Sequence, residues 1–493
     1  MYIRNEDTIC APATVPGTGA ISVIRVSGPD ALAIADNVIK CRKGNISESE
    51  GYTIKFGVIL EDAGAVLDEV LVSIFRAPHS YTGENSVEIS CHASSYIVSS
   101  VMNLLYAAGA HAAEPGEFTQ RAFLNGKMDL AQAEAVADVI ASQNAAAHRI
   151  AFKQMKGGFS SELKGMRSEL LELVSLMELE LDFSEEEVEF ADRSRLDSLL
   201  NQIIAHVSKL IDSFRLGNAI KNGVPVAIAG ATNTGKSTLL NALLGEDRAI
   251  VSDVHGTTRD TIEETLNIDG ILFRFIDTAG LRETEEVVEK IGIERTFKKI
   301  SEAAIVLGMV DLTRDFDTTS ETVKEILDKV DFDTQKLVIL LNKTDICEVN
   351  KNVITTNFIV SLLNNKGITS NITNTADLNH DLSENAEKTA TLVPISAKTG
   401  SGIEILRQIL ATSQRDLLGD SDTTLVTNQR HVQALSDART SLLRVREGLA
   451  SALPTDLAAQ DIREAIYHLG SIVGEISTDE VLGNIFRNFC IGK

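Results

Sequence analysis

Apolar residues along this chain repeat with two different spacings, and the change between them divides the chain. In the first part they alternate with polar residues, as in the run from Tyr52 to Leu60 and again at Val87, Ile89 and Cys91. A period of two is typical of a strand with one buried face. We therefore predict an α+β domain over residues 1–125, with half-buried strands at these two places.

Beyond this region the apolar positions step by three and four residues, which is typical of amphipathic helices. Two such stripes are Leu163, Met166, Leu170, Leu173, Met177, Leu181 and Leu196, Leu199, Ile203, Val207, Leu210, Phe214. The pattern returns near the end at Val432, Leu435, Leu442, Val445, Leu449 and at Ile462, Ile466, Leu469, Val473, Ile476. We predict one helical bundle built from residues 126–218 and 425–493, with the stripes as its core.

Residues 219–424, between the two helical parts, show a third pattern of short apolar runs that end in polar loops. The runs predicted as buried strands are Val224–Ala229, Leu272–Ile276, Leu337–Leu341 and Leu392–Ile395. We predict a doubly wound α/β domain inserted into the helical domain. The polar stretch from Asn350 to Lys388 reads as a surface insertion that is partly disordered.

The segment Gly230–Ser237, GATNTGKS, follows the first of these strands and precedes a helical run. It matches the phosphate loop G-x-x-x-x-G-K-S, whose glycines let backbone N–H groups converge on phosphate oxygens at a helix N-terminus. Lys236 would reach the β and γ phosphates, and the Ser237 hydroxyl would ligate Mg²⁺. Strand, loop and helix in this order predict a nucleotide site.

Three further motifs follow in the order that a GTPase requires, each after an apolar strand. They are Asp277-Thr278-Ala279-Gly280, Asn342-Lys343-Thr344-Asp345 and Ser396-Ala397-Lys398. The first suits an indirect hold on Mg²⁺ and a contact to the γ-phosphate. Asp345 can accept from the ring N–H and the exocyclic amine of guanine, a donor pair that adenine lacks. The residues predict a GTPase of the P-loop, Ras-like type.

Two features depart from a Ras-type site. Leu281 stands where a glutamine would orient the attacking water, and no arginine is obviously presented to the transition state. Asn233 and the segment Ser252–Asp260 could together cage a monovalent cation, with Thr258 as a second Mg²⁺ ligand. The glutamates between Leu281 and Glu289 could position water, but their spacing does not choose among the four, and a solvated helix face accounts for at least three.

The amino-acid composition and net charge limit which partners and which cellular compartment the protein can have. The 493 residues contain 46 Lys and Arg against 70 Asp and Glu, a net charge of −24. Since nucleic-acid affinity rests largely on phosphate neutralisation, any RNA contact must use a local basic patch or a partner protein. Five scattered cysteines suggest a reducing compartment. The sequence shows no signal peptide and no apolar run of the roughly 20 residues that span a bilayer. We predict a cytoplasmic protein without a membrane contact.

The motifs resemble those of the MnmE family, also called TrmE, the tRNA-modification GTPases of bacteria and organelles. The resemblance rests on Asn233, Gly256–Asp260, the sequence from Asp277 to Arg282 with Gly292–Arg295, and the C-terminal Cys490-Ile491-Gly492-Lys493. The chain's start is similar too, at Asp7–Ile9, Pro16-Gly17, Gly19 and Arg25–Gly28. The resemblance therefore covers essentially the whole chain.

The resemblance implies that potassium stands in for an arginine finger and that the G domains dimerise around it. Asn233, Ser252, Val254 and Thr257 would hold K⁺, Ser237 and Thr258 would hold Mg²⁺, and Glu289 would orient water indirectly. With Lys236 and Cys490, Glu289 forms the predicted catalytic set. The predicted GTP-binding residues are Asn233, Thr234, Gly235, Lys236, Ser237, Thr238, Ser252, Val254, His255, Gly256, Thr257, Thr258, Asp277, Thr278, Ala279, Gly280, Asn342, Lys343, Asp345, Ser396, Ala397 and Lys398.

At the N-terminal domain the resemblance implies a homodimer and a tetrahydrofolate site. Its residues would be Arg25, Glu88, Lys127 and Lys493, with Glu84 close enough in sequence to take the place of Glu88. Cys490 would serve the modification reaction, although a structural, buried cysteine is an open alternative. The implied partner is an FAD-dependent flavoprotein of the MnmG type, and the implied substrate is carbon 5 of the tRNA wobble uridine, with glycine or ammonium as amine donor.

Two other classes of function stay open at this point. One is a GTPase switch, such as a ribosome-assembly factor, whose flanking domains only bind partners. The other is a self-contained folate enzyme regulated by GTP. The first predicts no folate binding and the second predicts one-carbon turnover without a flavoprotein. The residues alone, without the resemblance, support a Mg²⁺-dependent GTPase inserted into a helical domain.

Overall fold

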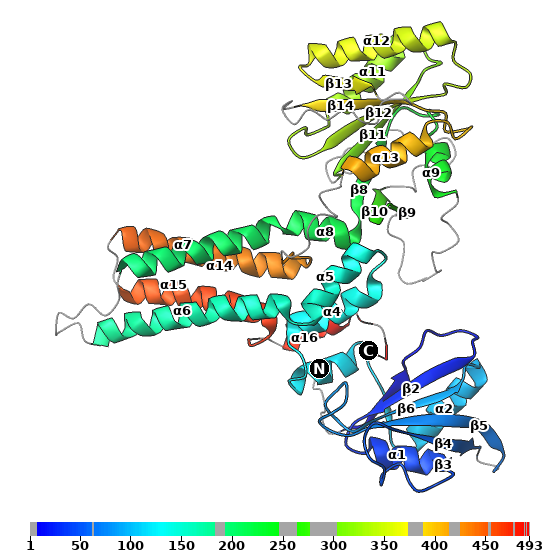
Figure 1. The fold of residues 1–493 in the computed structure, drawn as a ribbon, viewed down its shortest axis with the longest axis vertical. Helices are drawn as coiled ribbons and strands as arrows, with labels where there is room; N and C mark the ends of the chain where they lie inside the picture. Colours follow the sequence, from blue (N-terminus) through cyan, green and yellow to red (C-terminus); the bar gives the residue numbers. More distant parts are fainter. Residues whose placement is uncertain are drawn as a thin grey trace. The chain divides into compact units, whose positions relative to one another are not determined.

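The computed structural model describes residues 7–61, 64–182, 193–245, 264–276, 303–372, 388–413, 424–451, 455–476, 479–487, 489 and 491–492 (Figure 1). The chain divides into two compact units. The first comprises residues 1–141, 150–211 and 429–493, and the second comprises residues 142–149 and 212–428. The first unit contains the sheet expected near the N-terminus together with long helices, and the second contains the expected nucleotide-binding sheet. The domain boundaries near 125, 218 and 424 stay predictions.

The N-terminal sheet has the strand order β3-β4-β5-β6-β2-β1-β7. Its strands are β1 (Ile9–Pro12), β2 (Ile21–Ser27), β3 (Ile39–Cys41), β4 (Thr53–Leu60), β5 (Val66–Phe75), β6 (Ser86–His92) and β7 (His111–Ala112). Neighbours are antiparallel except β1 and β7, which run parallel. Helices α1 (Ala31–Val38) and α2 (Ser95–Ala107) share one core with the strands, in which Ile24, Val26, Val87 and Ile89 are fully buried. The α+β class is confirmed.

The alternating run in β4 forms a strand as predicted, but its apolar positions do not form the core face. Tyr52, just before the strand, is 72% exposed and Ile54 is 67% exposed, whereas Gly57 and Ile59 are buried. Register extends this open face to Leu71 on β5 and Ile21 on β2, which are 49% and 66% exposed. The sheet therefore presents apolar side chains on the face opposite its helices.

Four long helices of the first unit pack lengthwise (Figure 1). They are α6 (Gly158–Asp182), α7 (Arg193–Asp212), α14 (Gln429–Ala450) and α15 (Thr455–Val473). α15 packs against both α6 and α14, and α7 contacts α6 where Nε2 of His206 lies 2.5 Å from Oε1 of Glu162. The predicted core positions are buried at Leu163 to Met177 on α6, at Leu435, Leu442 and Val445 on α14, and at Ile462, Ile466, Leu469 and Val473 on α15. The helical bundle from two distant chain segments is confirmed.

A buried ion-pair network joins three helices of this unit. Glu134, on α4 (Leu130–Ala141), accepts from Nε and Nη2 of Arg430 at 3.0 and 2.9 Å and lies 2.6 Å from Nε2 of His431. Arg430 also donates to the carbonyls of Ser471 and Ile472 on α15. His431 is 2% exposed and Glu134 is 8% exposed. The first turn of α14 is thereby tied to helices on both sides.

This network predicts an acid-sensitive fold. Burial opposes ionisation of Glu134, but His431 and Arg430 outweigh burial and lower its pKa to about 2. A carboxylate whose folded pKa lies below its unfolded value stabilises the fold above the unfolded pKa, and this contribution is lost as the pH falls towards the folded pKa. We expect the stability of the helical domain to fall between about pH 5 and pH 2, as measured by urea unfolding followed by far-ultraviolet circular dichroism.

The Glu134→Gln variant tests whether this carboxylate is responsible. It leaves the partly buried Arg430 guanidinium and the buried His431 ring without their carboxylate partner, so it should cost about 3 kcal/mol at neutral pH and show a flatter acid dependence than wild type. Glu464→Gln is the control, because that carboxylate pairs with Arg444 at an exposed site, where pairs contribute little. An unchanged acid slope in Glu134→Gln would assign the dependence to other carboxylates.

The second unit contains a sheet in the order β13-β14-β12-β11-β8-β10-β9. The strands are β8 (Val224–Ala229), β9 (Glu264–Ile268), β10 (Ile271–Ile276), β11 (Ile305–Asp311), β12 (Lys336–Asn342), β13 (Thr369–Ile372) and β14 (Thr389–Pro394). All neighbours run parallel except β9 and β10. The predicted strands at 224–229, 272–276, 337–341 and 392–395 are confirmed to within a few residues. Since the chain winds outward from β8 in both directions, this is the expected doubly wound fold.

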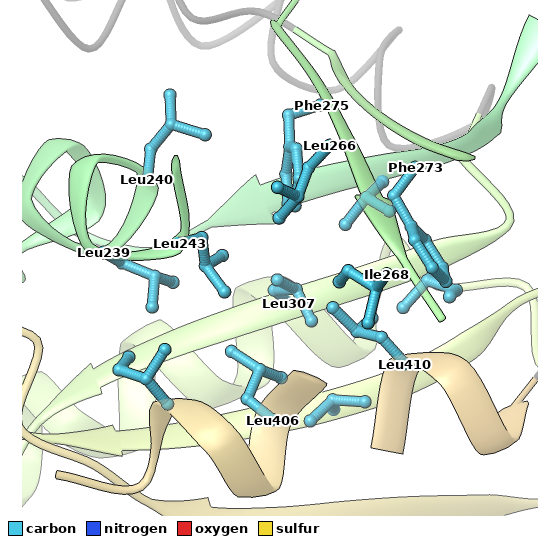
Figure 2. Close-up of a cluster of buried hydrophobic side chains, with 14 of the residues drawn as sticks. Leu239, Leu240, Leu243, Leu266, Ile268, Phe273, Phe275, Leu307, Leu406 and Leu410 are labelled. Carbon is cyan, nitrogen blue, oxygen red and sulfur yellow. The ribbon is translucent and has the colours of Figure 1, made fainter. Parts of the chain in front are cut away.

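Helices cover this sheet on both faces, which explains its almost uninterrupted apolar strands. On one face α9 (Lys236–Leu244) and α13 (Ile403–Ser413) pack on β8, β10 and β11, with Leu243, Leu307 and Leu406 fully buried among them (Figure 2). On the other face α11 (Phe316–Leu327) and α12 (Val349–Asn365) bury a second cluster that includes Val323 and Ile359. The carboxyl ends of β8, β11, β12 and β14 consequently meet at one edge.

The polar stretch from Asn350 to Lys388 was expected to be a partly disordered insertion, and for its first part this is wrong. Residues 349–365 form α12, which buries Thr355, Ile359 and Leu363, and residues 369–372 form the edge strand β13. The stretch is polar because α12 exposes most of its surface, while every fourth residue reaches the core. Residues 373–387 lie outside the described residues.

Four other described helices remain. α5 (Ala145–Met155) and α8 (Phe214–Asn222) precede and follow the long α6–α7 pair in sequence. α3 (Glu117–Leu124) and α16 (Asp479–Phe486) contact each other in the first unit. Measured over the described residues, every helix is too short or too polar to cross a membrane.

Candidate functional site

The phosphate loop joins β8 to α9 and depends on backbone conformations that its sequence permits. Gly230 and Gly235 have φ of 151° and 100°, and Asn233 adopts φ 60°. A Cβ at Gly230 would lie 2.6 Å from the Met309 carbonyl oxygen, and one at Gly235 would lie 2.5 Å from Nδ2 of Asn342. Both positions therefore exclude any side chain, and the loop curls closely around the start of α9.

Lys236 is held inside this loop by main-chain groups. Its Nζ donates to the carbonyls of Gly230 and Ala231, each at 2.9 Å. Burial lowers the pKa of Lys236, and the nearby Arg314 lowers it further. A half-buried ammonium bonded to neutral carbonyls gains strongly from an anion, so this group is placed to exchange carbonyls for phosphate oxygens. Ser237 and Thr238 follow it in the first turn of α9.

The base-recognition motif is tied to the phosphate loop through Asn342. Its Nδ2 donates to the Thr234 carbonyl at 2.7 Å, and its Oδ1 accepts from the backbone N–H of Ala397 at 3.0 Å. Asn342 is 3% exposed, so both bonds are shielded from water. One side chain thus joins the loops that follow β8, β12 and β14, which lie far apart in sequence.

Asp345 and Lys343 belong to the loop that directly follows β12. Oδ1 of Asp345 accepts from the Ser396 hydroxyl at 2.7 Å, which orients the carboxylate while leaving the side chain exposed. Lys343 adopts φ 70°, and its Nζ pairs with Oδ2 of Asp311 at 2.7 Å. Ser396 and Ala397 are buried and Lys398 is exposed. An oriented, accessible carboxylate is suited to accept the two adjacent N–H groups of guanine.

Sequence reasoning missed Asp311 and Arg314, which also belong to this edge. Asp311 ends β11 and is 4% exposed, and it fastens both Lys343 and the loop that carries Arg314. The sequence carried a signal for it, because an acidic residue at the carboxyl end of a buried run is the same pattern that identified Asp277 and Asp345. Arg314 showed no such signal.

Several predicted site residues lie outside the described residues. In the second unit these are Ser252, Val254, His255, Gly256, Thr257, Thr258, Asp277, Thr278, Ala279, Gly280 and Glu289. In the first unit they are Cys490 and Lys493. The structure brings together the other predicted nucleotide ligands, from Asn233 to Thr238 and from Asn342 to Lys398, at one edge of the sheet.

A second group of predicted residues meets on the open face of the N-terminal sheet. Arg25 on β2 donates to Oε1 of Glu88 on β6 through Nε at 3.0 Å and Nη2 at 2.8 Å. The Arg25 guanidinium carbon lies 5.1 Å from the ring centroid of Tyr81 and 5.6 Å from that of Phe118. Its Nη1 is 3.5 Å from the Gly492 carbonyl oxygen. The C-terminal tail therefore reaches Arg25 through Gly492, the residue directly before Lys493 in sequence.

Glu84 and Glu88, the two alternatives considered for this group, occupy different surroundings. Glu84 accepts from the Ser27 hydroxyl at 2.8 Å and from Nη1 of the buried Arg121 at 3.2 Å. Arg121 also pairs with Asp7 and Glu117, at 2.7 and 2.8 Å. Glu84 belongs to a structural network, whereas Glu88 faces Arg25. Lys127 lies nearer the loop before β6, and its Nζ donates to the Pro78 carbonyl at 2.9 Å.

Comparison with known proteins identifies the whole chain. Residues 8–127 match the family described as GTP-binding protein TrmE N-terminus, and residues 130–490 match the MnmE helical domain. The tRNA modification GTPase MnmE of Parabacteroides distasonis is 51% identical over 491 residues, covering 99% of this chain and all of that protein. The MnmE proteins of Bacteroides thetaiotaomicron and Flavobacterium johnsoniae are 51% and 50% identical, again over 99% of this chain and their full lengths.

Among solved structures, the chain matches Aquifex aeolicus Era bound to GDP and AlF4⁻ at 24% identity. The match covers 44% of this chain and 66% of that chain, with a TM-score of 0.27. The FeoB G domain of Methanococcus jannaschii covers 39% of this chain and 98% of that chain at 21% identity, with a TM-score of 0.25. With two family models that together match residues 8–127 and 130–490, and with full-length relatives at half identity, the chain belongs to the MnmE family of tRNA modification GTPases.

Proposed function

We propose that this GTPase neutralises transition-state charge with a potassium ion in place of an arginine finger. The residues that would hold K⁺ are Asn233, Ser252, Val254 and Thr257, and those that would hold Mg²⁺ are Ser237 and Thr258. The proposal is supported by Asn233, whose exposed side chain stands at the rim of the phosphate loop in a left-handed conformation. Carbonyl and amide oxygens are suitable donors for such an ion, which when bound would add positive charge beside the phosphates.

The chain's own groups would divide the remaining work of hydrolysis. Lys236 would leave its two carbonyl partners and bind the phosphates, and Asp345 would select guanine. Leu281 has no polar group, so Glu289 would orient the attacking water indirectly. Closure of two G domains on each other would complete the site and exclude bulk water. GTP turnover would then control the conformation of the bundle without supplying any atom to the tRNA.

Potassium activation predicts a cation-dependent rate. We expect GTP hydrolysis to be about tenfold or more faster in potassium chloride than in sodium chloride at equal ionic strength, because the larger ion fits a site that smaller Na⁺ fills poorly. Asn233→Ala should remove the preference. Asn222→Ala, which alters an exposed asparagine on α8, should keep it. Equal wild-type rates in the two salts, measured by phosphate release, would exclude the cation site.

We assign a tetrahydrofolate derivative to the open face of the N-terminal sheet. The residues that would hold it are Arg25, Glu88, Lys127 and Lys493. The donor set fits the ligand, because a carboxylate can accept from adjacent N–H groups of a pterin while cations meet its glutamate carboxylates. Tyr81 and Phe118 beside Arg25 offer flat apolar surfaces to the ring system. When bound, the cofactor would supply the one-carbon unit.

A homodimer through the N-terminal domain follows from the same face. Ile21, Ile54 and Leu71 are each about half to two thirds exposed, at 66%, 67% and 49%, on strands that share this side of the sheet. Several exposed apolar side chains on one face of a sheet are suited to an interface. A second copy would cover these side chains and lie next to Arg25 and Glu88, so dimerisation and folate binding would be linked.

A basic segment supports a direct contact with tRNA. Between Asp138 and Glu162 the sequence contains no acidic residue but includes Arg149, Lys153 and Lys156. Lys153 and Lys156 are exposed, and Nζ of Lys156 lies 5.0 Å from the ring centroid of the exposed Phe152. In a chain of net charge −24, this helix face combines phosphate-binding cations with an aromatic ring that can stack on a base.

The proposed reaction is modification of carbon 5 of the tRNA wobble uridine together with an FAD-dependent partner of the MnmG type. Cys490 would take part in the chemistry at the folate site. The test is mass spectrometry of tRNA nucleosides from cells that lack this chain. We expect aminomethyl-type wobble uridines to disappear, and to return with the wild-type chain but not with Cys490→Ser or Arg25→Ala. Unchanged nucleosides in the deletion would contradict the proposal.

A further inference from the structure

Arg314 reaches the phosphate loop from a different part of the chain. Its Nη2 donates to the carbonyl of Thr232, 82 positions earlier in sequence, at 2.5 Å. Thr232 lies in the middle of the loop, directly before Asn233. The contact joins the segment after β11 to the middle of the phosphate loop, and Arg314 belongs to none of the motifs that define the site.

The segment that carries Arg314 is fastened on both sides. Asp311 accepts from the backbone N–H and hydroxyl of Thr313 at 2.9 and 2.6 Å, and its carbonyl accepts from the Arg314 N–H at 3.3 Å. Asp315 caps α11 by accepting from the Thr318 N–H at 2.8 Å. A turn followed at once by a capped helix leaves the backbone of Arg314 little freedom. The backbone from which the guanidinium reaches the loop is therefore held in place.

Peptide geometry gives this contact a consequence for the nucleotide. In a trans peptide the C=O and the following N–H point in opposite directions. Holding the Thr232 carbonyl towards Arg314 thus directs the Asn233 N–H away from Arg314, in the opposite direction within the same peptide plane. Asn233 has φ 60°, a conformation that costs a non-glycine residue about 1 kcal/mol. Because a phosphate cradle needs successive N–H groups in one orientation, a group that stabilises this plane contributes to the cradle.

The positive charges near the loop also favour binding of a phosphate there. Arg314 and Lys236 bring two cations to one short segment, and their proximity adds to burial in lowering the pKa of Lys236. Asp311 neutralises them incompletely, because it pairs with Lys343 at 2.7 Å and lies 3.7 Å from Nε of Arg314. A triphosphate entering the loop would relieve the repulsion between the two cations.

We propose that Arg314 is a positioning residue for GTP hydrolysis, which orients the Thr232–Asn233 peptide so that the Asn233 N–H meets the phosphates and its side chain meets the activating monovalent cation. The part that concerns the cation rests on the proposed potassium activation, and the part that concerns the phosphates does not. Arg314 acts through Asn233 and through the loop, and it transfers no proton.

Arg314→Gln, Arg314→Lys and a matched control test this role in the full-length protein. Arg215→Gln is the control, since Arg215 also donates Nη2 to a main-chain carbonyl of this domain, that of Thr334, away from the phosphate loop. The measurements are kcat and KM for GTP at saturating potassium, the potassium concentration for half-maximal rate, and the thermal unfolding midpoint of each variant.

We expect Arg314→Gln to lower kcat about tenfold and to raise the half-activating potassium concentration several-fold, with a smaller change in KM. Arg314→Lys keeps the charge without the planar fork, so it should recover only part of the rate. The unfolding midpoint of both should stay within about 2 °C of wild type. Arg215→Gln should match wild type throughout.

Two results would overturn the proposal. One is a kcat for Arg314→Gln within about twofold of wild type at saturating potassium. The other is a loss of rate that follows a lowered unfolding midpoint, with the half-activating potassium concentration unchanged, because that combination indicates a structural contact only. If wild type shows no preference for potassium over sodium, the proposed cation site is wrong, and the kcat comparison still decides the role of Arg314 in phosphate positioning.

Discussion

Asp345→Asn is expected to weaken GTP binding by about a thousandfold, roughly 4 kcal/mol, and to make xanthosine triphosphate the better substrate. The Asp345 carboxylate is oriented by the Ser396 hydroxyl at 2.7 Å and can accept from both N–H groups on the guanine edge. An amide in its place keeps one acceptor but turns an N–H donor towards the exocyclic amine of guanine, so one donor faces another. Xanthine carries a carbonyl at that position and can accept from the amide.

The measurement is competition of the two nucleotides for a fluorescent guanine nucleotide, together with hydrolysis rates for each. The variant serves as its own control, because restored turnover with xanthosine triphosphate shows that the loops and Lys236 are intact. GTP affinity within about tenfold of wild type would mean that Asp345 does not contact the base. The motif that contains Asp345 would then have only a structural role, through the buried bonds of Asn342 to Thr234 and Ala397.

Arg121→Met is expected to destabilise the N-terminal domain by about 4 kcal/mol. Arg121 is fully buried and pairs with Asp7, Glu84 and Glu117, so its removal leaves three carboxylates close together without a counter-charge. Breaking such a network costs more than its net contribution to the fold, because the remaining charges stay desolvated. The effect should exceed that of any exposed ion pair in the described chain segments.

Tyrosine fluorescence during urea unfolding reports this domain selectively. The chain has no tryptophan, and of its six tyrosines only Tyr467 lies outside the first 125 residues. Arg42→Met is the control, because Arg42 is exposed and stacks on Phe56 at 4.8 Å, where truncation should cost at most about 1 kcal/mol. A fall in stability for Arg121→Met no larger than for this control would show that the three carboxylates do not depend on Arg121 as their counter-charge.

The nucleotide site was largely predictable because its information is local. The loop from Gly230 to Ser237 requires glycines and one lysine at fixed spacing, and the base motif requires Asn342 and Asp345 directly after a strand. Each requirement is met within a few consecutive residues, so a linear pattern can express it. The bundle stripes on α6, α14 and α15 were predictable for the same reason, since helical periodicity is a property of neighbours in sequence.

The failures have a common physical origin. The alternating residues of β4 predicted a strand but not which face it buries, because that depends on whether helices or open space lie on each side. The stretch from Asn350 to Lys388 looked like an insertion because α12 exposes most of its residues and needs few apolar contacts. Glu84 and Glu88 could not be told apart from sequence, since their partners Arg121 and Arg25 are 37 and 63 positions away.

By itself, then, the sequence determined the family, the GTPase motifs, and the order of the sheet and helical regions, because each of these is expressed in short-range spacing or in whole-chain similarity. The nucleotide ligands that it predicts within those motifs stay predictions. Only the tertiary structure decided that Asn342 joins three loops, that Glu88 pairs with Arg25 beside the C-terminal tail, and that Arg314 bonds to Thr232. Those contacts join residues tens to hundreds of positions apart, and chain folding, with burial and charge pairing to stabilise it, is what brings them within hydrogen-bonding distance.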